Sequence, residues 1–184
     1  VNNLYEYYRK LYNKNDGFIF TDFNINLVEY KNNKWILNNE ISSNIIVNAS
    51  GAWADEVANL FKIKPINVVP KTRTVFVFKP QNINIDNNCP LIADIEEKFY
   101  FKDQNDQIYA SPADETPSYP HDCHPDDLDI AIGIDRIQKA TKFKFNHIDN
   151  KWSGLRTFVQ DKSPVIGYEN SNKNFFWLVG QGGY

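Results

Sequence analysis

Apolar residues recur at helical spacing in three stretches of the chain, and each stretch predicts a helix. Residues 4–12 carry leucine and tyrosine at this spacing and end before Asn15-Asp16-Gly17, a sequence that favours a helix stop. Residues 52–61 follow a run of small residues, and their acidic side chains suit the positive end of a helix. Residues 125–143 begin with a proline, which is typical of a first helical turn.

Shorter apolar runs between these stretches predict strands. They lie at residues 17–21, 25–30, 34–37, 44–49, 68–69, 74–78, 92–94, 98–102, 107–111, 164–168 and 175–179, with extended chain over 145–159. Asn32-Asn33 favours a hairpin turn between the second and third runs. The run at 44–49 is expected to be a buried strand, and the proline-rich segment 112–125 is expected to be a loop.

The order of these elements predicts an α+β protein with two lobes. Strands and two helices come first, an antiparallel or mixed sheet with one long helix follows, and the last strands return to the start. We expect residues 1–62 and 151–184 to form one lobe and residues 63–150 the other. A chain that leaves one lobe and returns to it is one way to place a ligand at the seam between two lobes.

The composition is typical of a globular protein. The chain has 184 residues, of which 42% are hydrophobic and 15% aromatic, so it can bury a core. Its net charge of −3 indicates no nucleic-acid partner. It contains no apolar run of about 18 residues, so no transmembrane segment is expected. Its first residues lack the basic and apolar regions of a secretory signal.

Cys89 and Cys123 lie far apart in polar sequence. Two free thiols in a reducing cytosol are the favoured interpretation, and a disulfide between them is the alternative. The chain opens at Val1 rather than at a methionine, so we expect the natural start of the protein to lie elsewhere.

Two turns of small residues can bring backbone close to a ligand. Ala49-Ser50-Gly51 joins a strand to a helix, where free amides and the helix dipole favour a phosphate or a nucleotide. Gly180-Gln181-Gly182-Gly183 follows an apolar strand and permits close approach to a planar ligand. Tight strand-to-helix packing and an ordinary glycine turn explain the same residues without a ligand.

Arg156 is a candidate for binding a carboxylate, because its guanidinium can make a two-pronged contact from an extended segment. A structural salt bridge is the alternative. Tyr100 lies in an aromatic strand and can present its hydroxyl on the face opposite to Phe99 and Phe101, although such strands more often form core. The segment His121-Asp122-Cys123-His124 matches no common zinc spacing, so we expect no metal.

Four segments, taken together and in order, resemble the FAD-dependent amino-acid oxidoreductase family that contains D-amino-acid oxidase, glycine oxidase and sarcosine oxidase. They are IIVNASGAWADEVA at 45–58, SPADETP at 111–117, WSGLRTFVQDKSPVIGY at 152–168 and FFWLVGQGGY at 175–184. The resemblance spans nearly the whole chain, and it is nearest to the bacterial D-amino-acid dehydrogenase-like branch.

The resemblance implies a fold and a reaction. Residues 1–62 and 151–184 would belong to an FAD-binding lobe of Rossmann type, and residues 63–150 to a substrate lobe on a large antiparallel sheet. The expected reaction removes a hydride from the α-carbon of a small-molecule substrate, an amino acid or amine, and passes it to FAD. The resemblance leaves the electron acceptor open. It implies a cytoplasmic enzyme, with peripheral attachment to the inner membrane as a further option.

The resemblance also implies roles for single residues. Ala49-Ser50-Gly51 would pass near FAD, and Gly180-Gln181-Gly182-Gly183 would cover the flavin ring. The backbone of Ile25, in the first arm of the hairpin, would lie by the adenine end. Arg156 would clamp the substrate carboxylate and Tyr100 would line the same pocket, while no residue is assigned a catalytic acid or base role.

The sequence departs from the family pattern by lacking the Gly-x-Gly-x-x-Gly turn that holds the FAD phosphates. The family also continues past the glycine loop. We therefore expect the chain to be an internal fragment. It would need the flanking segments of its own full-length protein as partners, and it would be inactive without them. The alternatives are a non-catalytic binding or structural lobe and a glycerol-phosphate dehydrogenase-like flavoenzyme.

Overall fold

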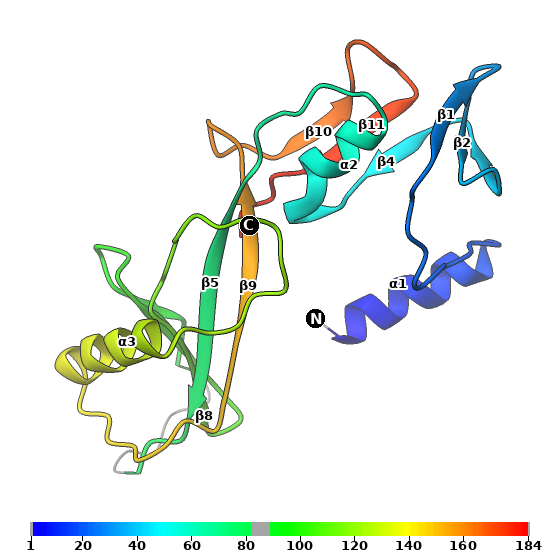
Figure 1. Ribbon diagram of the computed structural model, residues 1–184. Coiled ribbons are helices and arrows are strands. Elements are labelled where there is room, and N and C mark those ends of the chain that lie inside the picture. Colours follow the sequence, from blue (N-terminus) through cyan, green and yellow to red (C-terminus); the bar gives the residue numbers. More distant parts are fainter. Residues whose placement is uncertain (1, 82–88, 184) are drawn as a thin grey trace.

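The computed structural model describes residues 2–81 and 89–183 (Figure 1). Its helices are α1 (Asn2–Lys14), α2 (Ala54–Leu60) and α3 (Asp127–Ala140), and a 3₁₀ turn, η1 (Gly51–Trp53), precedes α2. Its strands are β1 (Val28–Lys31), β2 (Lys34–Leu37), β3 (Ile41–Ser43), β4 (Ile46–Asn48), β5 (Val69–Phe78), β6 (Ile92–Ala93), β7 (Tyr100–Gln104), β8 (Gln107–Ser111), β9 (Asn150–Phe158), β10 (Val165–Tyr168) and β11 (Phe175–Val179).

The described strands form three sheets. The first has the order β1-β2-β3, the second β10-β11-β4 and the third β6-β7-β8-β5-β9. Neighbouring strands are antiparallel in all three, except that β11 and β4 run in parallel. The mixture of helices with antiparallel and mixed sheets confirms the α+β prediction.

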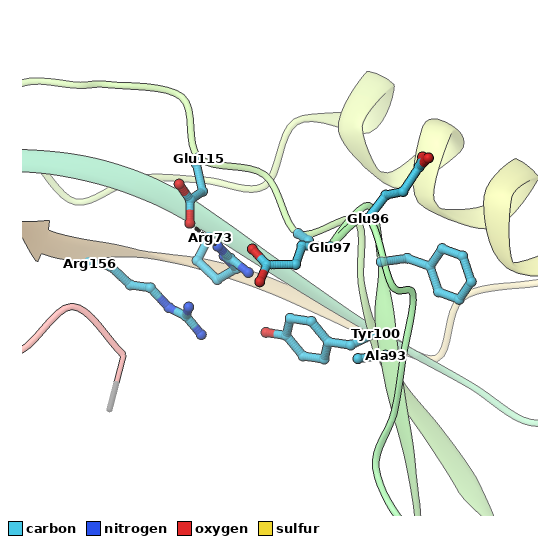
Figure 2. Close-up of a pocket in the computed structure, with 9 residues that line it drawn as sticks. Arg73, Ala93, Glu96, Glu97, Tyr100, Glu115 and Arg156 are labelled. Atoms are coloured by element: carbon cyan, nitrogen blue, oxygen red, sulfur yellow. Dashed lines mark hydrogen bonds and ion pairs between the residues drawn. The ribbon is translucent and has the colours of Figure 1, made fainter. Parts of the chain in front are cut away.

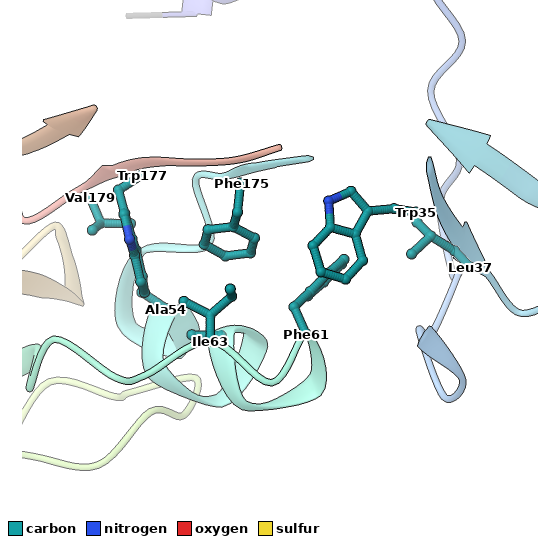
Figure 3. Close-up of a cluster of buried hydrophobic side chains, with 9 residues drawn as sticks. Trp35, Leu37, Ala54, Phe61, Ile63, Phe175, Trp177 and Val179 are labelled. Atoms are coloured by element: carbon teal, nitrogen blue, oxygen red, sulfur yellow. The ribbon is translucent and has the colours of Figure 1, made fainter. Parts of the chain in front are cut away.

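The first hydrophobic core lies between α2, β2 and β11 (Figure 3). Alternate residues of β11 point into it, because side chains along a strand alternate between the two faces. Trp35 enters from β2, and its indole Nε1 donates a hydrogen bond to the Asn174 carbonyl at 3.0 Å. The buried members are Trp35, Leu37, Ala54, Ala58, Phe61, Ile63, Phe175, Trp177 and Val179.

The second core lies where α3 covers one face of the five-stranded sheet. Its buried members are Phe76, Phe78, Phe99, Phe101, Ile108, Ala110, Ile130 and Ile137. Gly133 allows the close approach of α3, because a Cβ at this position would lie 3.0 Å from the ring of Phe76. Since Phe76 and Phe101 point towards α3, their neighbours along β5 and β7 point to the opposite face.

The long pair β5 and β9 joins the regions of the two cores (Figure 1). The pairing runs from Val69 opposite Phe158 to Val77 opposite Asn150. Directly opposed residues of an antiparallel pair share a face of the sheet. Lys71 and Arg156, which oppose each other, therefore project from the face that α3 leaves open.

The hairpin prediction is confirmed, and its turn has the expected chemistry. Asn32 and Asn33 join β1 to β2 with φ of 51° and 63°. Both values lie in the left-handed region that two-residue hairpin turns require and that asparagine tolerates. The first arm begins at Val28 rather than at Ile25, so Ile25 lies in the segment before the hairpin.

Two predicted strands differ from the structure. Residues 17–21 form no strand in the part of the chain that is described, and Phe18 is 76% exposed. An apolar run becomes a strand only when another strand supplies the hydrogen bonds of the ladder. The strand at 44–49 is shorter than predicted and only partly buried: β4 is an edge strand of its sheet, where Asn48 is buried and Val47 is 54% exposed.

The third helix begins later than predicted. Pro125 lies outside α3, and the carboxylate of Asp126 caps the helix by accepting a hydrogen bond from the Leu128 amide at 2.7 Å. The runs at 68–69 and 74–78 are parts of one strand, β5. None of the helices within residues 2–81 and 89–183 has the length and apolar character needed to cross a membrane.

Replacing Ile137 by alanine should lower the free energy of unfolding by about 2–5 kcal/mol, because the side chain is fully buried between α3 and the sheet. Leu128→Ala on the same helix should change it by less than about 0.5 kcal/mol, because Leu128 is 67% exposed. Urea denaturation of the two variants measures both values. Equal losses would contradict the packing of α3 described above.

Candidate functional site

The turns at residues 49–51 and 180–183 lie at the same edge of one sheet. They follow β4 and β11, which pair in parallel with Trp177 opposite Asn48. The carboxyl ends of neighbouring parallel strands meet at one edge, and open α/β sheets bind ligands there. The register therefore brings together the two turns that the sequence predicted to be near a cofactor.

Glycines at this edge have backbone conformations that other residues rarely adopt. The φ angles of Gly51, Gly180 and Gly182 are 57°, 75° and 62°. Glycine occupies this left-handed region without the steric cost of a Cβ. A Cβ on Gly51 would meet no atom within 4 Å, so the backbone of this turn is open to a ligand.

Asn48 holds the first turn in place. Its side chain is buried, and its Nδ2 donates a hydrogen bond to the Ala54 carbonyl at 2.9 Å. Its Oδ1 accepts from the Ser50 hydroxyl at 2.7 Å. The Asn48 side chain therefore links the end of β4 to the turn and to the start of α2. This role was not predicted from the sequence.

The first turn lines a hollow of about 510 Å³. The hollow lies between residues 49–53, residues 121–123 and residues 153–155 of β9. The loop that contains His121, Asp122 and Cys123 therefore faces the predicted cofactor turn. Within the described residues, no group of three or more His, Cys, Asp or Glu side chains is placed to hold a metal ion.

The second glycine turn is tied to the strand that carries Arg156. The Gly182 amide donates a hydrogen bond to the Thr157 carbonyl of β9 at 2.9 Å. Gly183 lies directly beside the Arg156 guanidinium, because a Cβ at this position would lie 2.7 Å from Cζ and Nη1. The guanidinium and the glycine turn therefore converge, as Figure 2 also shows.

Arg156 and Tyr100 line one cleft of about 500 Å³ (Figure 2). Tyr100 comes from β7, on the sheet face opposite to Phe99 and Phe101. Arg73 of β5 lies on the same wall, with its guanidinium carbon 5.9 Å from the centre of the Tyr100 ring, within cation–π range. The structure thus unites the two residues that the sequence predicted to line the substrate pocket.

Arg73 is committed to a salt bridge. Its side chain is only 10% exposed, and its Nη2 lies 3.0 Å from Oε1 of Glu115. The other carboxylate oxygen of Glu115 lies 3.2 Å from Nζ of Lys71. Glu115 therefore neutralises part of the positive charge beside the cleft.

Two opposing effects set the pKa of Glu115. Partial burial acts to raise the pKa, while the hydrogen bond and charge of Lys71 and the charges of Arg73 and Lys162 act to lower it. The cations prevail, so the pKa of Glu115 lies below its ordinary value.

The loop after β8 places Glu115 by continuing along β5. The Asp114 carboxylate accepts hydrogen bonds from the Thr74 amide at 2.7 Å and from the Thr74 hydroxyl at 3.1 Å. The Thr72 amide then donates to the Thr116 carbonyl at 2.9 Å. These hydrogen bonds, two from a side chain and one between backbones, attach the loop to β5 and so fix the position of Glu115.

Arg156 differs from Arg73 in having no protein partner. Among the described residues, no carboxylate or other acceptor forms an ion pair or hydrogen bond with its guanidinium. Its side chain is half-buried against the glycine turn. A partly buried cation gains most from a partner, so its free donors favour an anionic ligand.

Ile25 is not brought to either hollow. It is half-buried and packs against the first hydrophobic core, as Val28 and Ile41 also do. Its assignment to the hairpin arm is wrong, because β1 begins at Val28. Its proposed contact with the adenine end stays a prediction.

Arg73, Glu97 and Glu115 also line the cleft and were not among the site residues predicted from the sequence. The only local signal was the alternation of basic residues at positions 71 and 73, which places both on one face of a strand. The pairing of Arg73 with Glu115 depends on the path of the intervening loop, which no local pattern predicts.

The sequence matches the model of one protein family, described as FAD dependent oxidoreductase, over residues 3–184. FAD-dependent oxidoreductase domain-containing protein 1 of Mus musculus is 23% identical over 176 residues, covering 86% of this chain and 36% of the mouse protein. The structure of L-proline dehydrogenase from P. horikoshii has a TM-score of 0.71 and 21% identity, over 87% of this chain and 44% of that chain.

FAD-bound L-α-glycerophosphate oxidase from Mycoplasma pneumoniae has a TM-score of 0.70 and 12% identity, over 93% of this chain and 48% of that chain. These two structures share the fold of the chain. The chain spans less than half the length of each of the three proteins.

Replacing Glu115 by glutamine should destabilise the protein at neutral pH, because Lys71 and Arg73 lose their shared anion. A carboxylate with a lowered folded-state pKa contributes stability above its unfolded pKa of about 4.3 and loses it as pH falls through the folded-state pKa. The difference in free energy of unfolding between wild type and Glu115→Gln should therefore shrink as the pH falls below about 4.3 and through the lower folded-state pKa.

Urea denaturation across this pH range measures the difference. Glu40→Gln is the matched control, because Glu40 is exposed and its side chain has no partner among the described residues. A Glu115→Gln effect that persists unchanged at acid pH would show that the contribution is not one of charge.

Proposed function

This chain belongs to the family of FAD-dependent oxidoreductases, and from that premise we propose that its protein oxidises the Cα–N bond of an amino acid or a related amine. The activity is proposed for the complete protein, since the chain covers less than half of each relative described above. One protein of the same fold is an L-proline dehydrogenase, and this similarity supports an amino acid as the substrate.

The residues at the sheet edge fit a flavin cofactor. We propose that Ala49, Ser50 and Gly51 pass near FAD and that the turn at 180–183 lies against its ring. The support is the open backbone of Gly51 and the left-handed conformations of Gly180 and Gly182 at the ends of paired parallel strands. When bound, FAD supplies the acceptor for the hydride that leaves the α-carbon.

The unpaired guanidinium of Arg156 is the observation that carries the proposal. It lies beside Gly183 and lines the cleft without a protein partner in the described residues. We assign it to the substrate carboxylate, which its planar fork can hold through two parallel hydrogen bonds. Holding the carboxylate directs the Cα–H bond, and orientation of this kind can lower a barrier by about 7–11 kcal/mol at best.

Tyr100 is the proposed second contact to the substrate. Figure 2 shows its hydroxyl directed into the cleft on the same side as the Arg156 guanidinium. The cation of Arg73 lies against the ring of Tyr100 and restricts its position. We therefore assign the Tyr100 hydroxyl to a polar group of the substrate.

The two cores support the lobe assignment that the sequence suggested. The first core draws on residues before 64 and after 174, which agrees with one lobe built from 1–62 and 151–184 that contributes to FAD binding. The second core lies between residues 76 and 137, within the proposed substrate lobe 63–150. Cys89 and Cys123 are free thiols, which supports a reducing compartment such as the cytoplasm.

A glycerol-phosphate dehydrogenase-like activity is the second candidate. Lys71 opposes Arg156 across β5 and β9, and Arg73 lines the same cleft. Several cations together favour the binding of a phosphate. Glu115, however, forms ion pairs with Lys71 and Arg73, so of these three cations only Arg156 is left unpaired within the described residues. Reduction of the flavin by glycerol 3-phosphate and not by amino acids would select this candidate.

Replacing Arg156 by lysine in the complete protein should lower kcat/KM for amino acids by a factor equivalent to a loss of about 2–5 kcal/mol of transition-state stabilisation, because lysine cannot present two parallel donors. Oxidation of an amine without a carboxylate should be affected much less. Steady-state kinetics of both substrates measures the difference. Arg9→Lys is the control, since Arg9 lies on α1 in an exposed pair with Glu6. Unchanged amino-acid kinetics would remove Arg156 from the pocket.

The 184-residue chain alone should bind FAD weakly or not at all. Its sequence contains the two glycine turns but no Gly-x-Gly-x-x-Gly turn for the pyrophosphate, which supplies much of the contact in dinucleotide sites. A titration followed by flavin fluorescence measures the affinity. Tight stoichiometric binding would show that these residues suffice for the cofactor.

A further inference from the structure

Arg156 is not the only charged side chain of the cleft without a partner. Glu97 lines the same cleft, and its carboxylate forms no ion pair or hydrogen bond with any described residue. Figure 2 shows this carboxylate directed into the space that the Arg156 guanidinium and the Tyr100 hydroxyl also face. The cleft therefore offers a ligand one unpaired cation and one unpaired anion.

The neighbouring charges are already neutralised. Glu115 pairs with Lys71 and Arg73. Glu96 pairs with Lys98, and Figure 2 shows the Glu96 carboxylate turned away from the cleft. Glu96 and Glu97 are adjacent in sequence and alike in chemistry, yet only Glu97 presents a free charge to the cleft.

The turn before β7 fixes the position of Glu97. The Asp94 carboxylate accepts hydrogen bonds from the amides of Glu96 and Lys98, each at 3.2 Å, and the Glu97 amide donates to the Asp94 carbonyl at 3.0 Å. Glu97 has a φ of 57°, a left-handed conformation that residues with a Cβ rarely adopt. The hydrogen bonds of the turn hold Glu97 in this conformation.

A free carboxylate opposite a carboxylate-binding arginine selects the charge at the far end of the substrate. A ligand held by Arg156 through its carboxylate would extend across the cleft towards Glu97. Glu97 is exposed at the rim of the cleft, where its charge would repel an anionic end of the ligand and attract a cationic end.

The reacting amine is not the group that Glu97 would recognise. A carboxylate beside this amine would stabilise its protonated form. A protonated amine has no lone pair to assist hydride loss from the α-carbon, so this contact would oppose the reaction. The cation must therefore be a second group, at the end of the substrate side chain.

We propose that Glu97 is a specificity-determining residue, which selects amino-acid substrates that carry a guanidinium or ammonium group at the end of the side chain. This inference rests on the proposed amino-acid oxidation. It gives the substrate class of the same site: a dibasic amino acid, held by Arg156 at its carboxylate and by Glu97 at its distal cation.

Two ligands that cannot be oxidised test the charge preference directly. 5-Guanidinopentanoate is arginine without its α-amine, and 5-ureidopentanoate has the same shape and carboxylate but an uncharged urea in place of the guanidinium. In calorimetric titration of the complete FAD-loaded protein, the guanidino ligand should bind about tenfold more tightly. Glu97→Gln should abolish this preference, and Glu96→Gln should preserve it.

The outcomes separate this inference from the proposed function. Equal binding of the two ligands by wild type, or a preference that survives in Glu97→Gln, overturns the role of Glu97. Flavin reduction by arginine and citrulline, each tested as both enantiomers, supplies the second readout. Reduction by citrulline as efficient as that by arginine overturns only the Glu97 selection. The other common amino acids, each as both enantiomers, extend this readout. Flavin reduction by some of them but not by arginine overturns only the Glu97 selection, and reduction by none of them overturns the proposed function and the inference with it.

Discussion

The pairing of β5 with β9 is the interaction on which the candidate site depends. Its antiparallel register places Arg156 opposite Lys71, on the face that α3 does not cover. The hydrogen bond from Gly182 to Thr157 then attaches the glycine turn to the same strand. A shift of this register by one residue would turn Arg156 to the opposite face and separate it from the cleft.

The charged residues of the cleft fall into two groups: those that form ion pairs with one another, and those without a partner among the described residues, which are free to bind a ligand. Glu115 holds Arg73 and Lys71, and its lowered pKa keeps it ionised in this role. Arg156 and Glu97 have no such partner in the described part of the chain. Arg156 is partly buried, and the cost of leaving its charge unpaired is offset when an anionic ligand binds, whereas Glu97 is exposed.

Local features of the sequence could be predicted, and contacts between distant segments could not. The helices, the Asn32-Asn33 hairpin and the glycine turns follow from residue types whose backbone preferences are local. The strand expected at 17–21 failed because strand formation also needs a neighbour. The Arg73–Glu115 pair and the position of Glu97 depend on how loops cross β5 and β7. Carboxylate binding by Arg156 was one of two interpretations from the residue itself, and the family resemblance favoured it over a structural salt bridge.

The central claim is that the Arg156 guanidinium and the turn at 180–183 face one space shared by a substrate carboxylate and a flavin ring. A crystal structure of the complete protein with FAD and a carboxylate that lacks an α-amine tests it most directly. We expect the carboxylate to accept two hydrogen bonds from Arg156, with the flavin ring against the glycine turn. A flavin ring remote from this turn, or a carboxylate bound away from Arg156, would contradict the account.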